Sequence, residues 1–321
     1  SIIMELHHGK DMTELLRGQK DDWEQYYGQE EDVEVSKEVV QDYSKYFNGK
    51  RSLTMISEKT NDELCQPIEI LMNKRNNVVY SIENQGMQSF KVDINEYAPF
   101  SKIGKSVVME WKGQTVNPRH TLLNEDSNKL SLLDQSEGNL IYEFDLTKEK
   151  ILQRLETDDY FIRDISKTSG KNVLSENILA VSEQTIHYFD QRQKNANCKN
   201  REYKSNPQFN KIHGVDQESF VIGSQTGDLR FYSKFGQNSK NMIPAPNKEP
   251  VLCMDTSKDG RLLLITYRSC LLLLPTFQKS RSAFDYSFKK GEKPSPYILR
   301  VHPKTLVRNG VDRIVFNSGH F

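Results

Sequence analysis

A few residues of this chain have the types and spacing that could do chemistry. Gly104-Lys105-Ser106 could end a phosphate-binding loop, in which backbone amides and a lysine hold the phosphates of a nucleotide. The complete motif requires a glycine where Pro99 stands, and no strand-to-helix pattern follows. The sequence therefore does not predict nucleotide binding at this position.

Two pairs of adjacent side chains are further candidates for a catalytic or metal site. Asp158-Asp159 could act as paired carboxylates, although a loop between the fourth strand of one repeat and the first strand of the next is the favoured interpretation. His7-His8 could bind a metal ion, or lie exposed to solvent on a terminal segment.

The cysteines do not form a recognisable metal or nucleophile motif. They stand singly, without Cys-x-x-Cys and without a histidine at zinc-ligand spacing: Cys65, Cys198, Cys253 and Cys270. Cys253 and Cys270 fall inside predicted strands, where we expect small core residues. There is also no Gly-x-Ser-x-Gly nucleophile motif. We therefore expect a protein that is not an enzyme, with no catalytic, cofactor-binding or metal-binding residue.

The elements that could position a site recur along the chain as pairs of short apolar strands. Three pairs begin at residues 178, 220 and 262, so that both intervals are 42 residues, and looser copies begin at 78 and 130. A period of about 40 to 45 residues with four short strands per repeat is typical of a β-propeller blade. We predict an all-β, WD40-like β-propeller.

The turns and strand ends support this prediction. Gly, Asn and Asp in 136–139, 226–228 and 258–260 suit tight hairpins that need positive φ angles. The last of these turns makes 251–255 an inner strand that precedes the strand at 262. Phe144-Asp145 and Phe189-Asp190 end third strands, where a WD40 blade carries Trp-Asp.

Charge and hydropathy narrow the classes of partner and compartment. Lys plus Arg and Asp plus Glu both total 44 over 321 residues, so no global field attracts nucleic acid or membranes. The longest apolar stretch, 262–274, is interrupted at 266–269 and predicts two buried strands instead of a transmembrane segment. The sequence shows neither a signal peptide nor an N-glycosylation motif, and we expect a cytoplasmic location.

The two ends of the chain differ in charge. Residues 11–38 carry ten acidic and three basic residues, and 1–50 are predicted to form an acidic helical extension that either packs on the propeller or binds a partner. Residues 278–321 carry nine basic and three acidic residues. Within them, Tyr297–Val301 is predicted as another inner strand and Asp312–Phe316 as an additional strand. The propeller itself is assigned to residues 51–321.

Several segments resemble the vacuolar import and degradation protein 27 family. They are Ser224–Tyr232, Gly236–Lys240, Asp255–Arg261, Tyr286–Phe288, Lys293–Pro296 and Phe316–Gly319. The resemblance implies the family's C-terminal WD40-like domain, with seven blades when complete (six is the alternative). It implies that this chain covers about five and a half blades and lacks the closing segment and the pleckstrin-like N-terminal half. The family's name links it to vacuolar delivery and degradation of proteins, and no catalytic residues are assigned to it.

Two classes of function follow from these observations. The first is a monomeric, non-catalytic scaffold whose hairpins between second and third strands bind a protein or peptide partner. The candidate contact residues are Gln225, Asp228, Arg230, Lys240 and Arg268. The second is binding of nucleic acid or anionic lipid through basic residues 278–321. The aromatics of that region alternate with polar residues as in a strand, which disfavours base stacking and hence nucleic acid.

Overall fold

The chain divides into two compact units, Ser1–Leu64 and Cys65–Phe321. The computed structural model describes residues 67–92, 100–158, 160–168, 177–190, 198–216, 218–299, 316 and 318–320, all in the second unit. The helical extension expected in 1–50 lies outside them. Among the described residues there is no helix, and hence none with the length and apolar character to cross a membrane.

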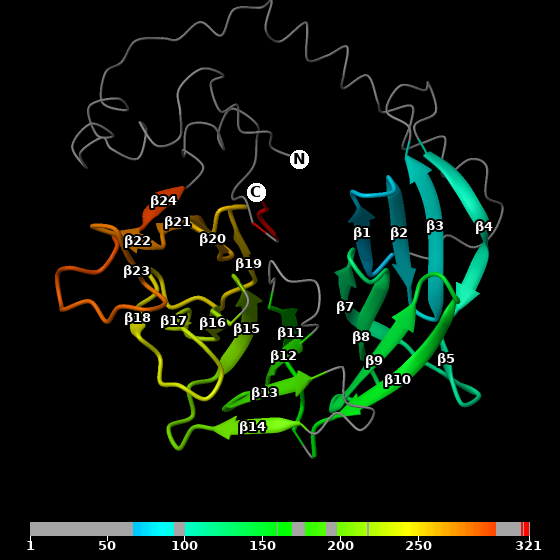
Figure 1. Ribbon diagram of the computed structural model, residues 1–321, viewed down its shortest axis with the longest axis horizontal. Helices are drawn as coiled ribbons and strands as arrows, with labels where there is room; N and C mark the ends of the chain where they lie inside the picture. The colour runs from blue at the N-terminus through cyan, green and yellow to red at the C-terminus, as the bar shows by residue number, and fades with distance from the viewer. Residues whose placement is uncertain are drawn as a thin grey trace, which may run out of the picture. The chain divides into compact units, whose positions relative to one another are not determined.

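The described residues form five antiparallel sheets of four strands each (Figure 1). Blade one consists of β1 (Glu69–Asn73), β2 (Val78–Glu83), β3 (Gly86–Val92) and β4 (Phe100–Val108). Blade two consists of β7 (Pro118–Asn124), β8 (Lys129–Asp134), β9 (Leu140–Asp145) and β10 (Lys150–Glu156). Blade three consists of β11 (Asp164–Lys167), β12 (Asn177–Val181), β13 (Thr185–Asp190) and β14 (Lys199–Glu202).

Blades four and five continue the same meander. They consist of β15 (Phe209–Gly214), β16 (Phe220–Ser224), β17 (Leu229–Tyr232) and β18 (Asn241–Ile243), then β19 (Cys253–Thr256), β20 (Leu262–Thr266), β21 (Leu271–Pro275) and β24 (Tyr297–Leu299). Two short hairpins lie outside the blades: β5 (Glu110–Trp111) with β6 (Gln114–Thr115), and β22 (Phe277–Gln278) with β23 (Arg281–Ser282).

The first strands of the blades contact one another in chain order. β1 lies against β7, β7 against β11, β11 against β15, and β15 against β19. The apolar core lies between successive blades, because each of the four buried clusters combines residues from two neighbours. Second strands are covered on both faces, and every residue of β12, β16 and β20 is buried. This is the predicted WD40-like propeller arrangement, with all five strand-pair repeats confirmed as the second and third strands of blades.

One strand prediction is wrong. Tyr297–Val301 was expected to start the next blade as an inner strand, but β24 pairs with β21 and is the fourth strand of blade five. The β22–β23 hairpin and the loop after it separate β21 from β24, so the fourth strand comes later than the period suggests. The strand expected over Asp312–Phe316 lies outside the described residues except for its last one. The seven-blade count stays a prediction.

Glycine is required in these turns for two different physical reasons. Gly227 and Gly260 have φ angles of 85° and 69°, as the hairpin prediction requires. Gly138 is not among the residues with positive φ, which corrects the prediction for that turn. A Cβ atom at Gly138 would lie 2.2 Å from the ring of Phe161, so the glycine there makes room for a side chain.

Candidate functional site

The structure brings three of the five predicted contact residues to neighbouring hairpins. Gln225 and Asp228 lie in the β16–β17 hairpin of blade four, and Arg268 lies in the β20–β21 turn of blade five. The hydroxyl of Tyr267 donates a 2.8 Å hydrogen bond to the carbonyl of Gly227, which joins the two hairpins. We call these two hairpins, residues 225–228 and 267–270, the tip pair.

The other two predicted residues lie away from the tip pair. Arg230 lies within β17, with its guanidinium carbon 5.8 Å from the centre of the Phe209 ring in the same blade. Lys240 immediately precedes β18, and its amide donates to the carbonyl of Phe231 at 2.7 Å. Since β17 and β18 are antiparallel and Leu229 pairs with Ile243, Lys240 is at the opposite end of blade four from the tip pair.

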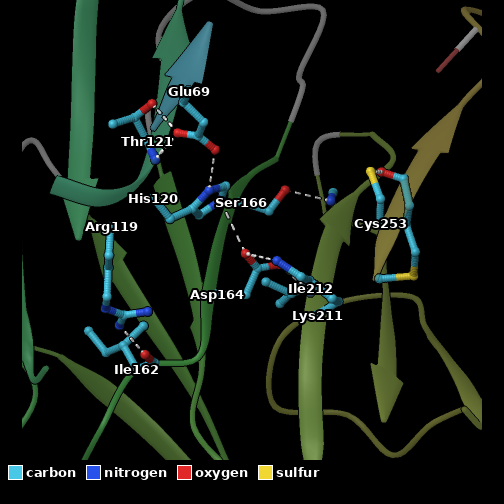
Figure 2. A network of polar contacts seen from close by, with 12 residues as sticks. Glu69, Arg119, His120, Thr121, Ile162, Asp164, Ser166, Lys211, Ile212 and Cys253 are labelled. Atoms are coloured by element: carbon cyan, nitrogen blue, oxygen red, sulfur yellow. Dashed lines mark hydrogen bonds and ion pairs between the residues drawn. The ribbon is translucent and has the colours of Figure 1, made fainter. Parts of the chain in front are cut away.

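A polar network that the sequence analysis missed joins the inner strands of blades one to four (Figure 2). It begins at Glu69 of β1, whose carboxylate lies 2.7 Å from Nδ1 of His120 on β7. The same carboxylate accepts hydrogen bonds from the backbone amide of Thr121 at 2.6 Å and from its hydroxyl at 2.5 Å. Glu69 thus holds both a side chain and a backbone amide of the next blade.

The arrangement recurs between blades three and four. Asp164 of β11 lies 3.3 Å from Nζ of Lys211 on β15, and it accepts a 2.9 Å hydrogen bond from the amide of Ile212. His120 and Lys211 therefore occupy equivalent places, each one residue before the amide that the carboxylate binds. Next to this contact, the Ser166 hydroxyl accepts a 2.9 Å hydrogen bond from the amide of Gly214.

His120 links the two carboxylates, because its Nε2 lies 3.1 Å from Asp164. Burial alone would lower the pKa of His120, but the hydrogen bonds to Asp164 and Glu69 outweigh it and raise the pKa to about 9. Burial raises the pKa of Asp164, and the charges of Lys211 and His120 more than reverse this, so its pKa is lowered. Glu69, Asp164, His120 and Lys211 form an inter-blade network in which His120 is protonated and Asp164 ionised at neutral pH.

Two further polar contacts continue the series at blade five. Nε2 of His213 on β15 lies 3.1 Å from the hydroxyl of Thr256 on β19. Asp255, also on β19, lies 3.5 Å from Nδ1 of His320, and this contact raises the pKa of the imidazole. The acidic residues of the first, third and fifth inner strands thus each pair with a basic side chain that follows in the chain.

The inter-blade network holds neighbouring inner strands together. Its carboxylates contact cationic side chains and accept hydrogen bonds from backbone amides. Among the described residues, no group of three His, Cys, Asp or Glu side chains is placed so that it could hold a metal ion. A signal for the network was present in the sequence. Glu69, Asp164 and Asp255 each belong to or adjoin an inner strand, where a charge must find a partner to be buried.

A second polar cluster superficially resembles a nucleophile with its base. Nε2 of His187 lies 2.7 Å from the hydroxyl of Ser182, and Nδ1 lies 2.8 Å from Oδ1 of Asn200 and 3.8 Å from Sγ of Cys198. Ser182 and His187 are both buried. Burial and the charge of Asp158 raise the pKa of Cys198 to about 12, so the sulfur is a thiol and not a thiolate at neutral pH.

The chain is similar to known proteins over this same region. A family described as the VID27 C-terminal WD40-like domain matches residues 66–321. Vacuolar import and degradation protein 27 of Saccharomyces cerevisiae is 24% identical over 241 residues, which are 72% of this chain and 31% of that protein. Its Schizosaccharomyces pombe namesake is 21% identical over 204 residues, 60% of this chain and 25% of that protein. The matched region therefore spans less than a third of either relative.

Proposed function

This chain belongs to the VID27 family, and we propose that its blades form a non-catalytic scaffold that binds a protein segment at the tip pair. The observation that carries the proposal is the exposed side chain of Arg268 on a turn whose backbone is fixed. The carbonyl of Arg268 accepts a 3.1 Å hydrogen bond from the amide of Phe316, and the neighbouring Tyr267 is hydrogen-bonded to Gly227 of blade four.

The adjacent hairpin adds a carboxylate that is held in place. Asp228 accepts hydrogen bonds from the amide of Ala245 and the hydroxyl of Thr226, both at 3.3 Å. A fixed carboxylate on one hairpin and an exposed guanidinium on the neighbouring hairpin suit the charged and polar groups of a peptide. Gln225 lies in the same hairpin and is included in the proposed contact. Arg230 and Lys240 remain candidate contacts of blade four away from the tip pair.

Two observations support a non-catalytic role. The carboxylates of the inter-blade network already bind cations and amides, so neither is a free general base. His187 is buried, and the pKa of its neighbour Cys198 is raised well above neutral pH, which disfavours an activated nucleophile. The scaffold proposal accounts for both polar clusters as contacts that hold strands together.

The name of the relatives indicates a setting for this role. We propose that the scaffold takes part in vacuolar import and degradation and works in the cytoplasm. Cys198, Cys253 and Cys270 are free thiols in the described part of the chain, which fits a reducing compartment.

The alternative function, binding of nucleic acid or anionic lipid through residues 278–321, has less support. Phe284 is 3% exposed and packs 5.2 Å from Phe231 between ring centres, so it does not offer a face to a base. Tyr286 is covered on one side by Arg281, at 4.3 Å from the ring centre, and packs edge-on against Phe288. Phe284 and Phe288 pack in the apolar cluster between blades four and five.

The proposal is tested by comparing proteins captured from cells by the full chain, Arg268→Ala and the matched control Arg261→Ala. Arg261 is also exposed and immediately precedes the same strand, β20, that Arg268 follows at its other end. We expect partners that Arg268→Ala loses and Arg261→Ala retains, with equal melting temperatures for all three proteins. Identical partner sets would overturn the proposal, and a lowered melting temperature of Arg268→Ala would assign the arginine a structural role.

A further inference from the structure

Phe161 is a large aromatic side chain that is 49% exposed, in the loop between β10 and β11. The loop is tied to the β8–β9 hairpin by several hydrogen bonds. The amide of Ile162 donates to the carbonyl of Gly138 at 2.8 Å, and the amide of Thr157 donates to the carbonyl of Asn139 at 3.0 Å. The side chain of Asn139 in turn donates to the carbonyl of Asp158 at 2.9 Å. Phe161 is therefore displayed to solvent from a fixed backbone.

The ring of Phe161 rests directly on Gly138. A Cβ atom at position 138 would lie 2.2 Å from Cδ2 and 2.4 Å from Cε2 of the ring. Since Gly138 does not have a positive φ angle, its backbone would accept other residues, and the ring is what requires glycine. Gly138 thus leaves space on the hairpin for the ring of Phe161, which remains half exposed.

Two guanidinium groups flank this ring. The Cζ atoms of Arg119 and Arg163 lie 4.7 Å and 5.3 Å from its centre. Arg119 is anchored, because its Nε donates to the carbonyl of Asp134 at 3.1 Å and its Nη2 donates to the carbonyl of Ile162. Figure 2 shows the latter contact. Burial and the charge of Arg163 lower the pKa of Arg119, while the charges of Asp164 and Asp134 oppose this. A further negative group close to both arginines would be attracted to both guanidinium groups.

We propose that Phe161, Arg119 and Arg163 form a surface, the Phe161 surface, that binds an acidic peptide segment of a partner protein. A carboxylate pairs with the guanidinium groups, and an apolar side chain beside it covers the ring. Aromatic residues and arginine are the types that carry most of the binding energy in protein interfaces. The surface lies at the hairpin of blade two that corresponds to the tip pair of blades four and five, and it is separate from Arg268.

The charges around the Phe161 surface favour a short acidic peptide over a nucleic acid. Glu137 and Asp158 are both exposed in the two segments that carry Gly138 and Phe161. They would repel a continuous run of phosphates, whereas a peptide can place one or two carboxylates at the arginines and neutral residues elsewhere. The test must therefore distinguish peptide binding from nucleic-acid binding at this surface.

The test selects random dodecapeptides displayed on phage against the full chain, with subtraction against the Phe161→Ala/Arg163→Gln double variant. Phe161 is 49% exposed and Arg163 is partly exposed, so we expect the variant to stay folded, with a melting temperature close to that of the wild type. Fluorescence anisotropy then measures the affinity of the full chain for each surviving peptide. The same measurement is made with versions of these peptides in which Asp and Glu are replaced by Lys, and with a twelve-nucleotide poly(U) RNA.

We expect the surviving peptides to be enriched in Asp and Glu. Each single variant, Phe161→Ala and Arg163→Gln, should weaken binding about tenfold or more, while Arg261→Gln and Arg268→Ala leave it unchanged. The proposal is overturned if subtraction leaves no peptides, if the lysine versions bind equally well, or if poly(U) binds more tightly than the peptides. Because Arg268→Ala is measured in parallel, failure here is distinct from failure of the tip-pair proposal.

Discussion

The imidazole of His120 lies 3.1 Å from the carboxylate of Asp164, and this contact joins the inner strands of blades two and three. The same ring contacts Glu69 of blade one, so a single side chain connects three blades. In a propeller the blades otherwise meet through apolar faces, which are not directional. The charged contacts add directional links that fix how successive inner strands lie against each other.

The first prediction is that the stability of the protein depends on pH through the protonation of His120. Its pKa is raised from 6.5 to about 9 in the folded protein. Its contribution is therefore complete below pH 6.5 and is lost as the pH rises through 9, a difference on the order of 3 kcal/mol. We expect urea unfolding to show a falling free energy of unfolding between these pH values, and His120→Gln to flatten that slope.

Among the described residues, the other histidines titrate outside this window or in the same direction with smaller effect. Burial lowers the pKa of His213 and of His187, so these residues reduce stability only below about pH 6.5. The pKa of His320 is also raised, but its side chain is 67% exposed and solvent screens it. His320→Gln is therefore the matched control, and an equal flattening in both variants would contradict the assignment to His120.

The second prediction separates charge from shape at Asp164, whose side chain is only 6% exposed. Asp164→Ala leaves Lys211, Nε2 of His120 and the amide of Ile212 without the carboxylate that they contact, and we expect a loss of about 3–5 kcal/mol. Asp164→Asn keeps an oxygen for that amide and should cost less. Chemical unfolding of both variants measures the difference. The exposed Asp126→Asn is the control, expected within about 0.5 kcal/mol of wild type.

The sequence predicted the second and third strands of each of the five described blades because these carry the densest apolar runs. β20 and β21, for example, are continuous apolar segments separated by a short polar turn. First strands mix polar with apolar residues, as β11 does with Asp-Ile-Ser-Lys. Fourth strands are the least regular, and β24 was assigned to the wrong blade because the β22–β23 hairpin lengthens its connection.

The site was harder to predict than the fold, for a geometrical reason. Glu69 and His120 are separated by 51 residues, and Asp164 and Lys211 by 47, so no local motif reveals them. They meet only because first strands of successive blades are neighbours. The tip-pair residues Asp228 and Arg268 could be placed from the 42-residue interval, since hairpins at equal positions of successive repeats become adjacent.

The third prediction concerns the close approach of blades four and five at Gly227. This residue has a φ of +85°, and a Cβ atom there would lie 2.4 Å from the backbone oxygen of Glu249 and 2.6 Å from the Cβ of Ala245. Gly236 has nearly the same φ, +87°, with nothing within 4 Å. We expect Gly236→Ala to cost about 1–2 kcal/mol for its backbone conformation alone. Gly227→Ala should cost roughly 1–3 kcal/mol more, from steric overlap.

Thermal and urea unfolding of the two alanine variants measure this difference. A third variant, Tyr267→Phe, removes only the hydrogen bond to the carbonyl of Gly227 and should cost about 1 kcal/mol. Equal losses for Gly227→Ala and Gly236→Ala would mean that the blades separate readily at this point, contrary to a rigid tip pair.

The last prediction concerns Asn241, which fixes the segment after the β22–β23 hairpin to blade four. Its side-chain amide donates to the carbonyls of Ala283 at 2.6 Å and Tyr286 at 2.7 Å, and its oxygen accepts from the amide of Phe288 at 3.0 Å. Asn241 is 3% exposed, so water cannot readily replace these partners. We expect Asn241→Ala to lose about 2–4 kcal/mol of stability, because each buried group left unpaired costs about 1–3 kcal/mol.

The same substitution should release the segment locally, before the blades unfold. Lys289 and Lys290 are exposed directly after the anchored residues, so limited trypsin digestion should cut there several times faster in Asn241→Ala than in wild type. Asn206→Ala is the matched control, since Asn206 is exposed and its side chain accepts one hydrogen bond from the nearby amide of Gln208. Unchanged cleavage at Lys289 and Lys290 in Asn241→Ala, identified by mass spectrometry, would show that other contacts hold this segment.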